Sequence, residues 1–160
     1  MDLIWEELIH GLSDRRHLAI VLIRVIAAIL IGALIGLQRE RARKPAGLRT
    51  HMLVSLGTTV VVLACSSSGM DMSGLSRVVQ GVVTGIGFVG AGSILKLSEQ
   101  RDVKGLTTAA GLWLTGAIGV AVGLGSLGIA LLGTAFTLIV LGLIGAIEAR
   151  IEKRFEDRTH

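Results

Sequence analysis

The sequence contains few charged residues, few aromatic residues and a single cysteine. Charged residues make up 18% of the 160 positions, whereas a typical soluble domain has about 25%. The aromatic residues are two tryptophans and three phenylalanines, with no tyrosine, so any aromatic belt at a membrane interface would be thin. Cys65 has no second cysteine to pair with, which excludes a disulfide within the chain. The shortage of charge excludes an ordinary soluble domain.

The sequence motifs of common enzyme and cofactor sites are also absent. There is no Walker motif, no nucleophile elbow and no cluster of zinc ligands. Gly85, Gly87 and Gly90 spell GxGxxG, but they lie inside an apolar stretch and lack the acidic residue about 20 positions later that a dinucleotide site needs. The four histidines share no helical face and are interpreted as surface residues: His10, His17, His51 and His160. We therefore expect no enzyme, no catalytic residue and no resident cofactor, and leave association with Mg²⁺ open.

Apolar residues and glycine are abundant. Hydrophobic residues make up 51% of the chain and 22 residues are glycine, which is nearly twice the usual glycine share of about 7%. Residues 105–147 form a run of 43 positions without an acidic, basic or histidine side chain. At about 1.5 Å per helical residue, this run can cross a hydrocarbon core of about 30 Å twice. The sequence therefore predicts an all-α polytopic membrane protein.

Five apolar windows predict about five transmembrane helices, at residues 18–37, 52–65, 78–95, 105–124 and 127–147. The second window has only 14 clean positions, so a tilted or partly re-entrant segment is the alternative there. Ser13 or Asp14 is expected to cap the first spanning helix.

Both ends of the chain are predicted to lie outside the membrane core. In the first 12 residues, apolar side chains recur at helical spacing opposite polar ones, which is typical of a helix lying on the membrane surface. Residues 148–160 are dense in alternating charge and are predicted to continue the last helix into the cytoplasm. We expect one transmembrane domain over 1–160, with an interfacial helix at 1–14, a helical bundle at 18–147, a cytoplasmic helical tail at 148–160 and no soluble C-terminal domain.

Lysine and arginine fall mainly on one side of the predicted membrane. That side holds 12 of the 16 basic residues, in the first loop, the third loop and the C-terminal tail. The other side holds Arg15, Arg16 and Arg77, with Arg24 just inside the first span. Because loops rich in lysine and arginine stay in the cytoplasm, the N-terminus is predicted to lie outside and the C-terminus inside.

Glycines recur at helical spacing within the spans. Gly32 and Gly36 form a GxxxG pattern in the first span, and Gly81 and Gly85 form another in the third. In lipid, small residues allow close helix contacts, so helix packing is predicted for Gly32, Gly36, Gly81, Gly85, Gly87, Gly90, Gly92, Gly116 and Gly119. A homo-oligomer, with a dimer favoured, is expected, and the first span is a candidate contact face. The alternative is a third span broken between Gly85 and Gly92, whose freed carbonyls would coordinate a cation.

Few ionisable residues fall within the spans. Arg24 is predicted to extend to the outer surface, or else to pair with Asp71 or Gln80. No acid lies at a span centre, which disfavours a proton relay and a carboxylate cage for a divalent ion. A magnesium pathway would have to use carbonyls, water and hydroxyls such as those of Thr84, Ser93, Thr107, Thr108 and Thr115. Asp71, near Cys65, Met70 and Met72 in an outer loop, is a weak metal candidate.

The densest polar segment is the loop after the first span, which contains five basic residues and the single proline, Pro45. Contact with anionic lipid is one interpretation. The other is a docking surface for another membrane protein, with Glu40 and Arg49 holding the loop in shape.

Four stretches resemble the MgtC/SapB family of bacterial inner-membrane proteins. They are residues 32–40 (GALIGLQRE), 46–55 (AGLRTHMLVS), 77–94 (RVVQGVVTGIGFVGAGSI) and 103–119 (VKGLTTAAGLWLTGAIG). The resemblance marks the following motif positions: Arg39, Glu40, Gly47, Arg49, Thr50, Arg77, Gln80, Gly87, Gly90, Gly92, Thr107, Thr108 and Trp113. The sequence departs from the family pattern at Gln38 and Gly74, where the family usually has acidic residues, and many members continue into a soluble C-terminal domain.

The resemblance implies a role in magnesium homeostasis, growth at low magnesium and virulence, in the bacterial inner membrane. It favours a non-catalytic regulator or interaction partner of other membrane proteins, such as ATP synthase. The alternative is a transporter or channel for magnesium or another cation that uses glycine-interrupted helices. The expected partners are the lipid bilayer, further copies of the chain and such a membrane protein, with no nucleic acid.

Overall fold

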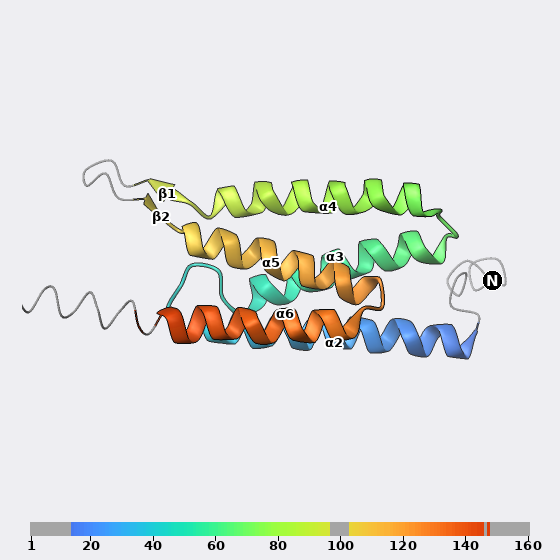
Figure 1. The fold of residues 1–160 in the computed structure, drawn as a ribbon, viewed down its shortest axis with the longest axis horizontal. Coiled ribbons are helices and arrows are strands. Elements are labelled where there is room, and N and C mark those ends of the chain that lie inside the picture. The colour runs from blue at the N-terminus through green and yellow to red at the C-terminus, as the bar shows by residue number, and fades with distance from the viewer. Residues whose placement is uncertain (1–13, 97–102, 146, 148–160) are drawn as a thin grey trace, which may run out of the picture.

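A computed structural model describes residues 14–96, 103–145 and 147. This part of the chain is a bundle of five long helices (Figure 1). They are α2 (Arg15–Arg41), α3 (Leu48–Ser67), α4 (Met72–Gly92), α5 (Leu106–Gly123) and α6 (Leu127–Ile139), which continues as the π-helical turn η1 (Val140–Ile144). All five, with α6 and η1 taken together, are long and apolar enough to cross a membrane. The prediction of an all-α polytopic fold is confirmed, while the interfacial helix at 1–14 and the tail at 148–160 lie outside the described residues, except for Asp14.

The helices α2 and α4 begin at aspartates that cap them. The side chain of Asp14 accepts a hydrogen bond from the backbone N–H of Arg16 at 3.0 Å. The side chain of Asp71 accepts one from the N–H of Gly74 at 2.8 Å. Each carboxylate thus satisfies one of the backbone donors left free at a helix start. Asp71, the weak metal candidate, therefore has a structural role as a cap.

Two spans for which the sequence left alternatives open are continuous helices. Helix α3 has 20 residues, enough at about 1.5 Å per residue to cross a bilayer core, so the re-entrant alternative is wrong. Helix α4 continues through Gly85, Gly87 and Gly90 without interruption. The alternative of a break between Gly85 and Gly92 is wrong, because regular helix geometry leaves no freed carbonyls there to coordinate a cation.

The bundle places α4 at one margin and α2 with α6 at the other, with α3 and α5 between them (Figure 1). Helix α3 packs against both α2 and α5, and α4 packs mainly against α5. A hairpin of two short antiparallel strands, β1 (Leu95–Lys96) and β2 (Val103–Lys104), connects α4 to α5. We call the end of the bundle that holds this hairpin, the end of α2 and the start of α3 the basic end.

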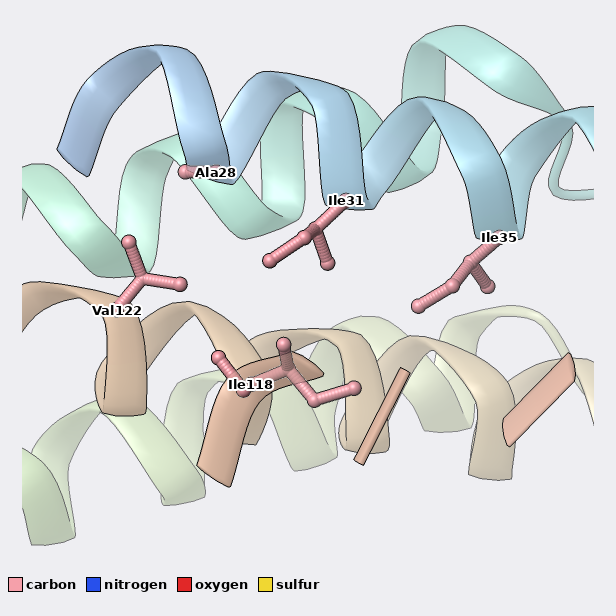
Figure 2. Close-up of a cluster of buried hydrophobic side chains, with 6 residues drawn as sticks. Ala28, Ile31, Ile35, Ile118 and Val122 are labelled. Atoms are coloured by element: carbon pink, nitrogen blue, oxygen red, sulfur yellow. The ribbon is translucent and has the colours of Figure 1, made fainter. Parts of the chain in front are cut away.

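The apolar core lies between α2, α5 and α6. Ala28, Ile31 and Ile35 of α2 point toward Ile118 and Val122 of α5 (Figure 2). Ala130 of α6 completes this buried cluster. Because lipid tails are as apolar as these side chains, the cluster stabilises the bundle through close van der Waals packing rather than through exclusion of water.

The glycines of the first span pack against a helix of the same chain. A Cβ added to Gly32 would lie 2.7 Å from both the carbonyl oxygen of His51 and the Cα of Met52. A Cβ added to Gly36 would lie 2.7 Å from the Cα of Leu48. The idea that these glycines form a contact face with a second copy is therefore wrong, because α3 already covers them.

The other glycines predicted to pack fall into two groups. Gly90, Gly116 and Gly119 face neighbouring helices of the chain; a Cβ on Gly119 would lie 2.6 Å from the carbonyl oxygen of Ser55. In contrast, beside four glycines of α4 such a Cβ would meet nothing within 4 Å beyond the backbone of its own helix and its chain neighbours: Gly81, Gly85, Gly87 and Gly92. Packing at these four positions stays a prediction, because no neighbour among the described residues approaches them.

Arg24 is half-buried and bonds to the end of α5 rather than to Asp71 or Gln80. Its Nη1 donates a hydrogen bond of 2.8 Å to the carbonyl oxygen of Gly123, at the last residue of α5. The carbonyls at a helix C-terminus lack intrahelical partners and carry partial negative charge, which favours a cation there. The bond lies at the end of the bundle opposite the basic end, which agrees with the expectation that Arg24 reaches toward the outer surface, whereas the alternative partners Asp71 and Gln80 are not used.

Candidate functional site

Buried polar side chains line the interface between α3 and α5. Their positions on α3 follow the spacing i, i+4, i+7 and i+8, which keeps them on one helical face. We call the set the polar seam; every member is at most 5% exposed, and the members are Arg39, His51, Ser55, Thr58, Thr59, Thr108 and Thr115. The seam runs from Arg39 at the basic end into the middle of the bundle.

Most hydroxyl groups of the seam donate to backbone carbonyls. Thr115 donates to the carbonyl of Gly111 in its own helix at 2.8 Å, and Thr58 donates to that of Val54 at 3.0 Å. Thr59 donates across the interface to the carbonyl of Gly119 at 2.8 Å. Hydrogen bonds between helices stabilise membrane bundles by about 1 kcal/mol each, so the seam joins α3 to α5.

Arg39 supplies the charge of the seam. Its Nη2 donates to the hydroxyl oxygen of Thr108 at 3.0 Å, while its Nε has no hydrogen-bond partner among the described residues. Removing a charged group from water costs several kcal/mol when it is incompletely paired. Burial of this guanidinium therefore carries a free-energy cost that the hydrogen bond to Thr108 only partly offsets.

His51 lies next to Arg39 in the seam and is completely buried. Its Nδ1 lies 3.0 Å from the carbonyl oxygen of Gly47, so a proton on Nδ1 would be donated there and leave Nε2 as an acceptor. Nε2 and the hydroxyl of Ser55 have no partner among the residues described. The interpretation of His51 as a surface residue is wrong. Its spacing of four from Ser55 could have indicated that it shares a polar face of α3 with that residue.

The seam is poorly suited to hold a bare divalent cation. In the described part of the chain, no three His, Cys, Asp or Glu side chains are grouped so that they could bind a metal ion. Mg²⁺ is usually bound through one or two carboxylates with water, and the seam offers hydroxyls, an imidazole and a guanidinium. The positive charge of Arg39 would repel such an ion.

Helix α4 carries polar and small residues on a face that no other part of the described chain covers. We call this face the α4 surface; its members recur every three or four residues, twice as an adjacent pair, and are all exposed: Arg77, Gln80, Gly81, Thr84, Gly85 and Phe88. Phe88 is 82% exposed. The hydroxyl of Thr84 donates to the carbonyl of Gln80 at 2.9 Å.

At the basic end, Glu40 holds the loop between α2 and α3. Its Oε2 accepts a hydrogen bond of 2.8 Å from the backbone N–H of Leu48, the first residue of α3. A Cβ on Gly47 would lie 2.8 Å from the same carboxylate oxygen, so a larger residue there would displace the Glu40 side chain. Arg49 is exposed and Thr50 is half-buried beside this loop.

Comparison with known proteins identifies the chain. The sequence profile of the MgtC family matches residues 25–150. The chain belongs to the MgtC family. It is 45% identical to "Protein SrpB" of Synechococcus elongatus over 129 residues, which are 74% of this chain and 71% of that protein.

Two further relatives of the MgtC family are more distant. The chain is 38% identical to "Putative magnesium transporter YhiD" of Escherichia coli over 79% of its own length and 61% of that protein. It is also 38% identical to "Protein MgtC" of Salmonella typhimurium over 89% of its own length and 60% of that protein. The chain thus spans about three fifths of the length of these two relatives. No solved structure matches.

The MgtC-family motif positions do not form one site. Arg39 and Thr108 meet in the polar seam, Glu40, Gly47, Arg49 and Thr50 lie together at the basic end, and Arg77 and Gln80 lie on the α4 surface. Thr107 and Trp113 are exposed on α5, with Trp113 at 45%. The structure therefore separates the motif into an interior part, the basic end, the α4 surface and exposed positions on α5.

Gln38, a departure from the MgtC-family pattern, also has a structural partner. Its Nε2 donates to the carbonyl oxygen of Leu141 at 3.0 Å. Leu141 belongs to the π-helical turn η1, where the wider hydrogen-bond pattern disturbs the regular pairing of carbonyls. The amide of Gln38 supplies the donor that a carboxylate at this position would lack.

Proposed function

We propose that this member of the MgtC family is a non-catalytic regulator in magnesium homeostasis that acts by contact with other membrane proteins. Membership of the family and the relative named as a putative magnesium transporter support the link to magnesium. We place the protein in the bacterial inner membrane with the N-terminus outside, as the distribution of its basic residues favours.

The α4 surface is the observation that carries the proposal. Gln80 and Thr84 would face lipid tails in a single copy, where polar side chains gain nothing and tend to pair with other helices. Gly81 and Gly85 leave open space that lets a second helix approach closely. A partner helix seated on this surface would satisfy the amide of Gln80 and pack against the glycines.

The expected homodimer uses the same surface in our proposal. Gly32 and Gly36 are covered by α3, which leaves α4 as the helix with an open GxxxG pattern. In two copies related by an axis along the membrane normal, the Gln80 amides face each other, and each can both donate and accept. A regulated partner, which the family resemblance suggests is ATP synthase, would compete with the second copy.

Disulfide crosslinking in liposomes tests this proposal. In a Cys65→Ser background, a cysteine replaces Gly85 on the α4 surface or, as the control, Leu131, which is 60% exposed on α6. Gly85→Cys is expected to form crosslinked dimers that decrease when purified ATP synthase is reconstituted alongside, whereas Leu131→Cys crosslinks weakly in both cases. Equal crosslinking from both positions, or none from Gly85→Cys, would contradict the proposal.

Magnesium transport is the second candidate function. The polar seam favours it, because a line of buried hydroxyls and carbonyls could exchange with the water around an ion. The uncompensated guanidinium of Arg39 disfavours it, since a divalent cation entering the seam would meet a positive charge. The continuous course of α4 also removes the broken helix that would have supplied carbonyl ligands.

A further inference from the structure

A hollow of about 650 Å³ lies where α2 ends and α3 begins. We call it the basic hollow; it is lined by residues 40, 43–45 and 47–50. Three of its side chains are cationic, those of Arg43, Lys44 and Arg49, and Glu40 is the one acid among its lining residues. The lining therefore carries an excess of positive charge.

The turn that carries Arg43 and Lys44 has a well-defined backbone. The N–H of Lys44 donates to the carbonyl of Arg39 at 3.1 Å and that of Arg43 donates to the carbonyl of Glu40 at 2.9 Å, which are the paired bonds of a Schellman turn. Arg43 has a φ of 53°, a left-handed conformation that glycine adopts easily and arginine does not. Backbone strain of this kind is often tolerated where the side chain is used.

The single acid of the hollow does not cancel its cations. The carboxylate of Glu40 already accepts the N–H of Leu48, at the start of a 20-residue helix. The positive end of the helix dipole and this hydrogen bond hold the carboxylate at the start of α3, and the cations outnumber it three to one. Arg43, Lys44 and Arg49 are thus left to attract an anion from outside the chain.

The position of the hollow along the membrane normal indicates which anion it binds. Arg41 ends one membrane-spanning helix and Leu48 begins the next, so the hollow between them lies at the level of the lipid headgroups. We propose that the basic hollow binds the phosphate group of an anionic phospholipid. Arginine and lysine donors suit phosphate oxygens, and the lipid supplies that phosphate at the height where the three cations converge.

Lipid titration of the purified full chain tests this site. Binding of phosphatidylglycerol, phosphatidylcholine and inorganic phosphate is measured separately by native mass spectrometry in detergent. The variants are Arg43→Gly, Lys44→Gln and Arg49→Gln, singly and combined, with Arg41→Gln as the control because Arg41 is an exposed cation at the same end that does not line the hollow. A hydrogen bond to a charged group contributes about 1.5 kcal/mol, which is roughly tenfold in affinity, so each single variant should bind phosphatidylglycerol roughly tenfold more weakly and the combined variant more than about a hundredfold more weakly.

The separate titrations decide the outcome. The site is supported when phosphatidylglycerol binds more tightly than phosphatidylcholine and each hollow variant weakens it while Arg41→Gln does not. Equal loss in Arg41→Gln, equal affinity for the two lipids, or tighter binding of inorganic phosphate than of the lipid would overturn it. Arg43→Gly separates binding from folding, because glycine suits this φ: its melting temperature should stay the same or rise while its lipid affinity falls.

Discussion

Because α2 packs closely against α3, adding one methyl group at their contact should measurably lower the stability of the protein. In Gly32→Ala, the added carbon would lie 2.7 Å from backbone atoms of His51 and Met52. Ordinary contacts begin near 3.4 Å, so the two helices must separate locally by roughly 0.7 Å. These atoms belong to a helix backbone and cannot rotate away as a flexible side chain would.

Gly57→Ala provides a matched control for this substitution. Gly57 lies within α3, and a Cβ there meets nothing within 4 Å. Both variants gain about 1 kcal/mol in helix propensity, and only Gly32→Ala incurs an overpacking cost of about 1–3 kcal/mol. The gains in helix propensity cancel in the comparison. The difference between the two free energies of unfolding should therefore equal the cost of overpacking at Gly32.

Denaturation in mixed micelles measures that difference. Both variants are unfolded with increasing sodium dodecyl sulfate while helix content is followed by circular dichroism. Gly32→Ala should be less stable than Gly57→Ala by about 1–3 kcal/mol. If Gly32→Ala proves as stable as Gly57→Ala, the close packing of α2 on α3 is refuted.

Three further predictions concern single interactions, each measured by the same denaturation assay. Thr108→Val removes the hydroxyl that accepts from Arg39 and should cost about 1–3 kcal/mol, because it leaves a buried charged donor without that partner; an unchanged stability would contradict this. Arg24→Gln removes the bond to the carbonyl of Gly123 and should cost about 1–2 kcal/mol, whereas a loss matched by Arg41→Gln would indicate a general charge effect. Chelation of Mg²⁺ should leave stability unchanged, because the positive charge of Arg39 disfavours a divalent cation in the polar seam; a destabilisation would reveal a bound ion.

The spans were predictable from the sequence because a bilayer core tolerates few charges. The uncharged run at 105–147 contains α5 and α6 with its π-helical extension, and the cap at Asp14 follows from the residue type that best accepts helix N–H groups. These features depend on local composition alone, which a single sequence records.

The partners of individual residues were less predictable, because they depend on which helix faces become neighbours. The same GxxxG pattern packs inside the chain at Gly32 and Gly36 but remains open at Gly81 and Gly85. His51 shares no helical face with another histidine, and it is buried in the polar seam only because α5 packs against α3. Spacing along one helix shows which residues share a face, while tertiary contacts determine what that face meets.

Magnesium flux into liposomes tests most directly whether this protein regulates by contact or carries ions. Purified protein is reconstituted into vesicles that contain a Mg²⁺-sensitive dye, and uptake is followed after a magnesium gradient is imposed. The proposed function predicts uptake no faster than in empty vesicles. Saturable uptake that is lost in Thr115→Val, which removes a hydroxyl of the polar seam, but kept in Gly57→Ala would contradict it and establish transport.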